Sequence, residues 1–166
     1  DFSLDLKLPI MSWVETASGN RIASTATMSG THSIVISAHT VVAPGVVIHG
    51  DRLTSASHSI QIGTYCYLGE KTEISPPPAD DGSKTFVAIR IGSFAIIGAN
   101  CSLLGLSVGN RVIIEDNVRL GDFSIVYDCC VVRLGAIVPP RYVVPPFSEV
   151  LGTPGVDFVV QPLGSG

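Results

Sequence analysis

Aliphatic residues recur every six positions along most of this chain. From Val108 the series runs unbroken through seven positions: Val108, Ile114, Leu120, Val126, Val132, Val138 and Val144. The same spacing is found earlier, at Ile91, Ile97 and Leu103, at Ile62, Leu68 and Ile74, and more weakly at Ile36, Val42 and Ile48. A helix would show a period of 3.6 or a heptad, which this series does not match. The pattern predicts short strands joined by regular corners.

A second position, four residues after each aliphatic residue, usually carries a small side chain. Its members are Thr40, Val46, Cys66, Thr72, Ala95, Cys101, Val112, Val118, Ser124, Cys130 and Ala136. This position must also face inward, where a narrow interior has no room for bulk. Glycine often follows the aliphatic residue directly, as at Gly63 and Gly92, where a corner needs a permissive backbone. Two inward positions and one corner per hexad define a prism.

Three such hexads make one coil of about 18 residues, and stacked coils pair their strands in parallel at about 4.8 Å. We therefore predict an all-β fold, a single-stranded parallel β-helix of hexapeptide repeats. The expected organisation is an N-terminal arm and cap over residues 1–35, the β-helix over 36–150 and a C-terminal tail over 151–166. The hand of the coil does not follow from this arithmetic. Resemblance to hexapeptide-repeat proteins implies the left hand.

Two interruptions of the repeat carry information about its corners. The step from Leu103 to Val108 is five residues instead of six, which shortens one corner. Residues 75–88 contain a proline run and clustered turn formers, so we expect a loop that leaves the prism. Near the end of the repeat, Pro139 and Pro145 follow aliphatic positions and cannot donate to a further strand, which suits a terminating coil.

An open β-helix exposes strand edges at both ends, and exposed edges invite uncontrolled pairing. The candidates to cover them within the chain are the N-terminal stretch through Ile34 and the tail after Phe147. A similarly built partner stacked end to end is the other candidate.

Composition narrows the range of partners. Hydrophobic residues make up 46% of the 166-residue chain, charged residues only 14%, and the net charge is −4. Binding of nucleic acid needs a basic surface, so it is not expected. The chain has no apolar stretch of about 20 residues, so membrane insertion is not expected either. Three of the four cysteines fall on inward positions, which favours a reducing cytosol over a disulfide framework.

Three segments resemble the dynactin subunit 5 family of hexapeptide-repeat proteins. They are WVETASGN at residues 13–20, SIVISAHTVVAPGVVIHGD at residues 33–51, and the stretch from Cys129 to Gly155. The ETASGN run is the most specific of these. The resemblance implies a non-catalytic subunit of the dynactin pointed-end complex, located in the cytoplasm on the microtubule cytoskeleton. The implied partners are dynactin subunit 6, dynactin subunit 4, an actin-related protein and coiled-coil cargo adaptors.

Enzymes are the alternative, because hexapeptide prisms also include γ-class carbonic anhydrases and acyltransferases. A γ-type zinc site needs three imidazole ligands that meet between subunits. This chain has four histidines, His32, His39, His49 and His58, all before the main repeat. Acyl transfer typically uses a histidine at a cleft between prisms, and the repeat from Ile62 to Val144 has none. We therefore predict no catalytic residue, no metal site and no cofactor.

Two short motifs carry side chains with possible chemistry. His49-Gly50-Asp51 stands where related enzymes usually carry Arg-Gly-Asp, and its imidazole beside a carboxylate is either a base or a simple corner turn. The turn explains the motif with fewer assumptions. The pair Cys129-Cys130 is a weak metal motif, because neighbouring strand residues point to opposite faces.

If the chain is not a catalyst, its function must lie on its outer walls. The outward hexad positions with large apolar side chains are candidates for protein binding: Tyr65, Tyr67, Phe94, Ile96, Phe123 and Tyr127. Aromatic side chains on a flat wall are good anchors for a partner helix or a second prism. The other interpretation is that some of them lie beneath the 75–88 loop or a terminal arm. Only a contiguous exposed patch distinguishes the two.

Overall fold

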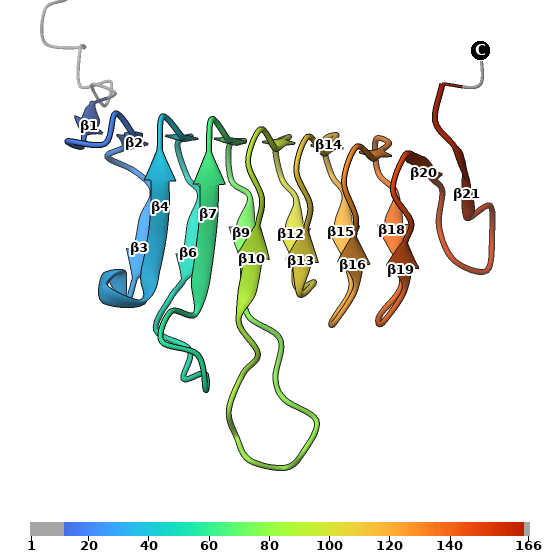
Figure 1. The fold of residues 1–166 in the computed structure, drawn as a ribbon, viewed down its shortest axis with the longest axis horizontal. Coiled ribbons are helices and arrows are strands. Elements are labelled where there is room, and N and C mark those ends of the chain that lie inside the picture. The colour runs from blue at the N-terminus through green and yellow to red at the C-terminus, as the bar shows by residue number, and fades with distance from the viewer. Residues whose placement is uncertain (1–11, 165–166) are drawn as a thin grey trace, which may run out of the picture.

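A computed structural model describes residues 12–164 of the chain as a three-sided prism of stacked coils (Figure 1). The three walls are mainly parallel sheets, the first of which has an antiparallel strand at each end, and each coil supplies one short strand to each wall. Sheet A contains β1 (Trp13–Glu15), β2 (Arg21–Ala23), β5 (Val41–Val42), β8 (Tyr67–Leu68), β11 (Ile96–Ile97), β14 (Ile113–Ile114), β17 (Val131–Val132), β20 (Ser148–Leu151) and β21 (Val159–Pro162).

The other two walls have six strands each. Sheet B contains β3 (Thr27–Ser29), β6 (Val47–His49), β9 (Glu73–Ile74), β12 (Ser102–Leu103), β15 (Arg119–Leu120) and β18 (Ile137–Val138). Sheet C contains β4 (Ile34–Ala38), β7 (Ile60–Thr64), β10 (Ile89–Ile91), β13 (Ser107–Val108), β16 (Ile125–Val126) and β19 (Val143–Val144). A short 3-10 turn, η2 (Thr31–Ser33), precedes β4. The predicted all-β parallel β-helix is confirmed.

The core is a continuous column of inward side chains. Val108 pairs with Ile91 in the previous coil and with Val126 in the next, and all three are at most 3% exposed. Every small inward residue that the hexad spacing predicts, from Thr40 to Ala136, is also buried. The five-residue step between β12 and β13 is a shortened corner at residues 104–106.

At the small inward positions, Thr40, Thr72 and Cys101 donate to carbonyls of the neighbouring coil, whereas the buried Ser124 hydroxyl has no partner among the described residues. Thr40 donates its hydroxyl to the carbonyl of Gly63 at 3.1 Å, and Thr72 donates to Gly98 at 2.8 Å. The Cys101 thiol makes the same kind of contact with the carbonyl of Glu115, at 3.2 Å. Burial raises the pKa of the Cys101 thiol. These hydroxyl and thiol groups therefore satisfy corner carbonyls that face the dry interior.

The prism begins earlier than the repeat pattern indicated. β2 and β3 pair in parallel with β5 and β6, so residues 21–29 form part of the first coil. The sequence interpretation had placed these residues in the N-terminal arm. Their signal is weak because the series Ile22, Met28 and Ile34 is short and the spacing shifts by two residues to Ile36.

Two loops leave the prism at the corner between sheets B and C. The loop at residues 75–88 joins β9 to β10, as predicted, and hangs from the body in Figure 1. The shorter loop at residues 50–59 joins β6 to β7 and meets it. Phe86 donates its N–H to the carbonyl of Leu53 at 2.8 Å, and the Arg52 guanidinium lies over the Phe86 ring. Asp80 forms an ion pair with Arg141, which fastens the long loop to the last coil.

The C-terminal end of the prism is closed by the chain itself. β21 pairs antiparallel with β20, and Phe158 packs edge-on against Tyr142 with ring centroids 5.2 Å apart. The N–H of Tyr127 donates to the carbonyl of Val144 in the next coil. The position 18 residues after Tyr127, where a further N–H donor would be exposed, is occupied by Pro145. The tail after Phe147, one of the candidates to cover this end, thus extends sheet A and packs against the core, and among residues 12–164 sheets B and C end at β18 and β19.

Candidate partner-binding wall

The outer face of sheet A carries an unbroken apolar ladder. Its outward residues pair in register from coil to coil: Val41, Tyr67, Ile96, Ile113 and Val131. Tyr67, Ile96 and Ile113 are 40%, 50% and 41% exposed, so the middle of this ladder faces solvent. We call these five residues, with Leu134 at the adjoining corner, the sheet A wall.

In the central coils the equivalent positions on the other two sheets are polar, and apolar outward residues stand only toward the ends of those sheets: Val35, Ile125 and Val143 on sheet C, and Val47 and Ile137 on sheet B. Sheet C presents Gln61, Arg90 and Ser107 in register, and sheet B presents Glu73, Ser102 and Arg119. The three walls therefore differ in chemistry although the same repeat builds them. A contiguous exposed apolar patch is typical of a protein-binding surface.

A column of flat side chains borders the sheet A wall at the corner with sheet C. His39 stacks on Tyr65 with centroids 4.8 Å apart, and Tyr65 stacks on Phe94 with centroids 5.6 Å apart and an interplanar angle of 6°. The Arg111 guanidinium covers the other face of Phe94 at 4.8 Å from its centroid. We call these four residues the corner column.

The corner column has a conformational cause. Each member occupies the same corner position in its own coil, two residues before the outward residue of sheet A, and has a positive φ of 51° to 59°. This backbone turns the side chain outward. The separation of neighbouring strands, about 4.8 Å, then places one planar group over the next.

The ETASGN turn closes the N-terminal end of the corner column. Gly19, at φ +81°, lies under the His39 ring, and a Cβ there would be 2.6 Å from Nδ1. The buried Asn20 side chain accepts a hydrogen bond from the Thr40 N–H at 2.8 Å and donates to the Ile36 carbonyl at 3.3 Å. The motif that is most specific in the sequence therefore has a structural role.

The sheet A wall is slightly hollowed. A depression of ≈ 400 Å³ has Tyr67, Ile96, Ile113 and Leu134 among its lining residues, and Glu115 and Asp116 form an acidic rim at the corner with sheet B. A depression of ≈ 590 Å³ on sheet C is lined mostly by polar residues, with Arg90 among them. The sheet A hollow is apolar with an acidic rim, so it fits an apolar side chain of a partner that has a basic residue beside it.

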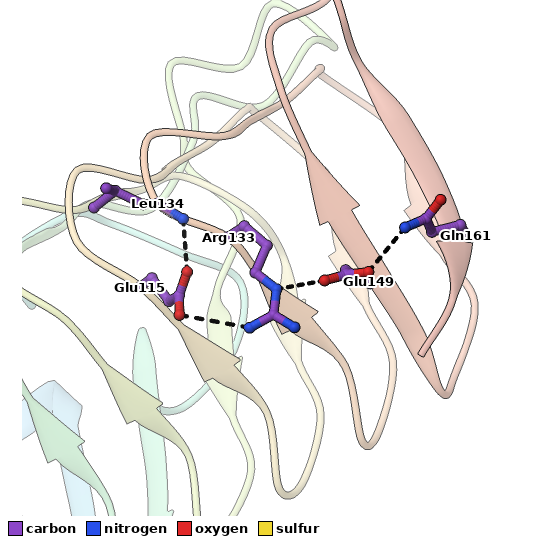
Figure 2. Close-up of polar contacts among 5 residues, drawn as sticks. All are labelled: Glu115, Arg133, Leu134, Glu149 and Gln161. Carbon is purple, nitrogen blue, oxygen red and sulfur yellow. Dashed lines mark hydrogen bonds and ion pairs between the residues drawn. The ribbon is translucent and has the colours of Figure 1, made fainter. Parts of the chain in front are cut away.

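Polar side chains end the wall toward the C-terminus. Figure 2 shows Arg133 between Glu115 and Glu149, with its Nε donating to Glu149 at 2.5 Å. Gln161 of β21 donates to the same carboxylate at 2.9 Å, and Glu115 accepts from the Leu134 N–H at 2.8 Å. Hydrogen bonds from Gln161 and then Arg133 lower the pKa of Glu149. This cluster ties the closing strand to the last coils and bounds the apolar surface.

Four of the six residues proposed from the sequence lie together, and two do not. Tyr65 and Phe94 belong to the corner column, and Tyr67 and Ile96 to the sheet A wall. Phe123 lies at the corner between sheets B and C, half-buried beneath the Arg141 guanidinium. Tyr127 lies at the edge of the sheet C depression. The six residues therefore do not form one patch.

Four residues of the wall were missed from the sequence: Val41, Ile113, Val131 and Leu134. A signal for Ile113 and Val131 was available. Ile113 follows Ile96 by 17 residues and Val131 follows Ile113 by 18, which is the length of one coil. Coil-to-coil spacing would have located them, whereas a search for aromatic side chains did not.

The histidines are scattered over the molecule. His32 is in η2, His39 is in the corner column, His49 contacts Glu73 at 2.5 Å on sheet B, and His58 is in the 50–59 loop. Within residues 12–164, no group of three or more His, Cys, Asp or Glu side chains is arranged to hold a metal ion. The four cysteines of the described chain are free thiols, and Cys129 alone among them is not buried. A search of the described residues for a helix that could cross a membrane finds none.

These features define the class of protein: a left-handed β-helix of hexapeptide repeats. Solved structures agree with this fold. PerB from Caulobacter crescentus, in complex with CoA and GDP-perosamine, has a TM-score of 0.56 at 15% identity over 86% of this chain and 56% of that one. A mutant perosamine N-acetyltransferase from the same organism gives 0.51 at 20% identity, over 86% and 56%. At these identities the likeness shows the fold alone.

The chain belongs to the dynactin subunit 5 family, whose family model matches residues 5–162. Dynactin subunit 5 of Dictyostelium discoideum is 32% identical over 99 residues, which are 59% of this chain and 48% of that protein. The match thus spans about half the length of this relative. The family resemblance of the ETASGN and C-terminal segments is confirmed.

Proposed function

We propose that this chain is a non-catalytic subunit of the dynactin pointed-end complex and that the sheet A wall and the corner column are its partner-binding surface. Its proposed neighbours are dynactin subunit 6, dynactin subunit 4 and an actin-related protein, and the complex is proposed to bind coiled-coil cargo adaptors. The proposed location is the cytoplasm, on microtubules. Family membership and the contiguous exposed apolar ladder of the sheet A wall support this proposal.

The dimensions of the wall suit an α-helix. Five stacked strands at about 4.8 Å extend over roughly 20 Å, which a helix of about 13 residues matches at 1.5 Å per residue. Helices that dock in such grooves present apolar anchors at intervals of three and four residues. The acidic rim at Glu115 and Asp116 favours a helix with Lys or Arg beside its apolar stripe.

Affinity purification with matched variants tests the surface. Ile96→Asp and Ile113→Asp place a charge in the hollow, and Ser107→Asp makes the same change on the outer face of sheet C. We expect the unaltered chain and Ser107→Asp to recover dynactin components, and the two wall variants to lose them. Equal recovery by all four proteins would reject the sheet A wall as the binding surface.

Assembly state distinguishes the proposal from the enzyme alternatives. Hexapeptide enzymes form their catalytic clefts between like subunits, so a stable homotrimer that ignores dynactin subunit 6 would contradict the adaptor function. Light scattering of the chain alone, then of the chain mixed with dynactin subunit 6, should show a heteromer. Metal analysis should show no stoichiometric zinc, because the four histidines lie in different parts of the molecule. One tightly bound zinc per subunit would support the γ-carbonic-anhydrase alternative.

A further inference from the structure

Ile96, the most exposed residue of the apolar ladder, lies between two opposite charges. Its side chain is 50% exposed, and its partner in the next coil is Ile113. That next coil crosses sheet A from Arg111, at the corner with sheet C, to Asp116, at the corner with sheet B. One wall of one coil thus carries a cation at one edge and an anion at the other.

Arg111 is directed back toward the coil of Ile96. Its guanidinium covers the ring of Phe94, two residues before Ile96, at 4.8 Å from the centroid. Arg111 forms no ion pair with any residue in 12–164. A guanidinium stacked on an aromatic face keeps the N–H groups at its edge available for an acceptor. The positive charge at this edge of the wall is therefore positioned but not compensated.

Asp116 is directed the same way at the opposite edge. Its Oδ1 accepts a hydrogen bond from the Ala99 N–H at 2.8 Å. Gly98 leaves room for this carboxylate, since a Cβ there would lie 2.3 Å from Oδ1.

The neighbouring acidic residue of the rim is already paired. Glu115 lies 3.6 Å from the Arg133 guanidinium, whereas Asp116 forms no ion pair within the described residues. The uncompensated negative charge of the rim is therefore that of Asp116.

The separation of the two charges matches the width of a helix. The chain from Arg111 to Asp116 spans at most about 17 Å at roughly 3.3 Å per residue. An α-helix with its side chains is about 10 to 12 Å across. A helix seated on Ile96 and Ile113 would therefore fit between the two edges and reach each charge with a long side chain from one of its flanks.

We propose that the sheet A wall selects a partner helix that has an acidic residue on one flank of its apolar stripe and a basic residue on the other. The acidic residue pairs with Arg111 and the basic residue with Asp116, on either side of an apolar anchor over Ile96. This inference rests on the proposed function of the wall and adds the charges that specify the partner. A helix with the same charge on both flanks would set one of them against a like charge, which lowers its affinity.

Three helical peptides of about 18 residues, roughly five turns, test this selection on the full chain. All have the same apolar anchors at intervals of three and four residues. One has Glu on one flank and Lys on the other, the second has Lys on both flanks, and the third has Glu on both. In fluorescence anisotropy at low salt, the mixed peptide should bind about three-fold or more tightly than the other two, and added salt should reduce the difference.

Two neutral variants assign the preference to its residues. Arg111→Gln should abolish the advantage of the mixed peptide over the Lys peptide, because these two differ only on the flank that faces Arg111. Asp116→Asn should abolish the advantage over the Glu peptide for the equivalent reason, and it keeps the oxygen that accepts the Ala99 N–H. Each variant should leave the other preference in place.

Matched controls separate charge from packing and from position. Arg111→Lys keeps the charge and should keep the preference for the mixed peptide. Arg119→Gln removes an exposed cation from sheet B. Asp128→Asn removes an exposed carboxylate whose Oδ1 accepts the Asn110 N–H at 2.8 Å, the same kind of bond that Asp116 makes. Both of these variants should bind the three peptides as the parent does.

The outcomes distinguish this inference from the proposed surface. Equal binding of the three peptides, lost in Ile96→Asp, overturns the charge selection and still supports the wall as a binding surface. A preference that survives in both Arg111→Gln and Asp116→Asn overturns the assignment to these residues. Failure of all three peptides to bind overturns the helix selection, while recovery of dynactin components by the parent and not by Ile96→Asp would still support the wall. Binding that is undiminished in Ile96→Asp overturns the inference and the surface together.

Discussion

Tyr65 lies parallel to Phe94, one coil further along, with ring centroids 5.6 Å apart and 6° between the planes. Both rings are largely exposed, at 56% and 44%, yet they hold a fixed position because the corner backbone and the coil spacing align them. A rigid aromatic surface of this kind loses little conformational entropy when a partner binds. The first prediction follows from this relationship.

Tyr65→Ala and Phe94→Ala should weaken partner binding far more than folding. Each loses a stacking contact of about 1 kcal/mol in stability, while truncation of a central anchor commonly lowers affinity by about ten-fold or more. Phe123→Ala is the matched control, since its ring also lies at a corner but on the far side of the prism. Titration calorimetry with dynactin subunit 6 or an adaptor helix measures the first effect and thermal melts the second. If Phe123→Ala weakened binding as much as Tyr65→Ala and Phe94→Ala, the corner column would be rejected as a binding surface.

Charges in the core should unfold the prism. Val118 and Val132 are at most 1% exposed, so Val118→Asp or Val132→Asp would bury an unpaired carboxylate and destabilise the fold by about 4 kcal/mol or more. Asn117 is exposed at a corner with φ 61°, a conformation that Asp also tolerates, so Asn117→Asp should be nearly neutral. Circular dichroism melts compare the three. Equal stability would mean that the inward and outward positions have been exchanged.

The core was predictable from the sequence because each inward position repeats in every coil. Val118 and Val132 could be assigned by counting in sixes, and the same arithmetic located the 75–88 loop as a break. The first coil was missed because the series Ile22, Met28 and Ile34 is short and out of phase with the series that starts at Ile36. The wall was only partly predicted. Successive hexads belong to different sheets, so Phe123 and Tyr127, although outward, face away from Tyr67.

Contacts between distant residues could not be predicted in this way. Asn20 and Thr40 are 20 residues apart, and they meet only because one coil closes on the next. The sequence identified the ETASGN turn as distinctive, but nothing in its spacing shows that the Asn20 amide bonds to the Thr40 N–H and the Ile36 carbonyl. Family resemblance detected the motif, and the structure supplies its physical role.

Replacement of the Asn20 side chain should destabilise the fold by more than the small change in side-chain size suggests. Asn20 is 4% exposed, and Asn20→Ala would leave the Thr40 N–H buried without its acceptor, a loss of about 1 to 3 kcal/mol. Ser18→Ala changes an exposed residue of the same turn and should stay within about 0.5 kcal/mol of the parent. Urea titrations measure both. If Asn20→Ala proved as mild as Ser18→Ala, water or a backbone shift would have replaced the amide oxygen.

The Glu149 carboxylate should make the closing strand sensitive to acid. Its hydrogen bonds from Gln161 and Arg133 lower its folded-state pKa below the ordinary value of 4.5. A carboxyl group whose pKa is lower in the folded state stabilises that state at pH values above its unfolded-state pKa. This contribution is lost as the pH falls through the folded-state pKa. The stability difference between the parent and Glu149→Gln should therefore be full near neutral pH and should shrink below the ordinary value of 4.5. Urea titrations between about pH 3 and about pH 7 measure it.

Glu70→Gln is the control for that titration. Glu70 is an exposed carboxylate that forms no ion pair with any residue in 12–164, so its replacement should leave the pH dependence unchanged. Salt provides a second check, because added salt screens exposed charges and should reduce the Glu149→Gln effect at neutral pH. Hydrogen exchange in β21 should rise in Glu149→Gln before the central coils respond, since Gln161 ties that strand to β20. A uniform change along the whole prism would show that the cluster acts on global stability and not on the closing strand.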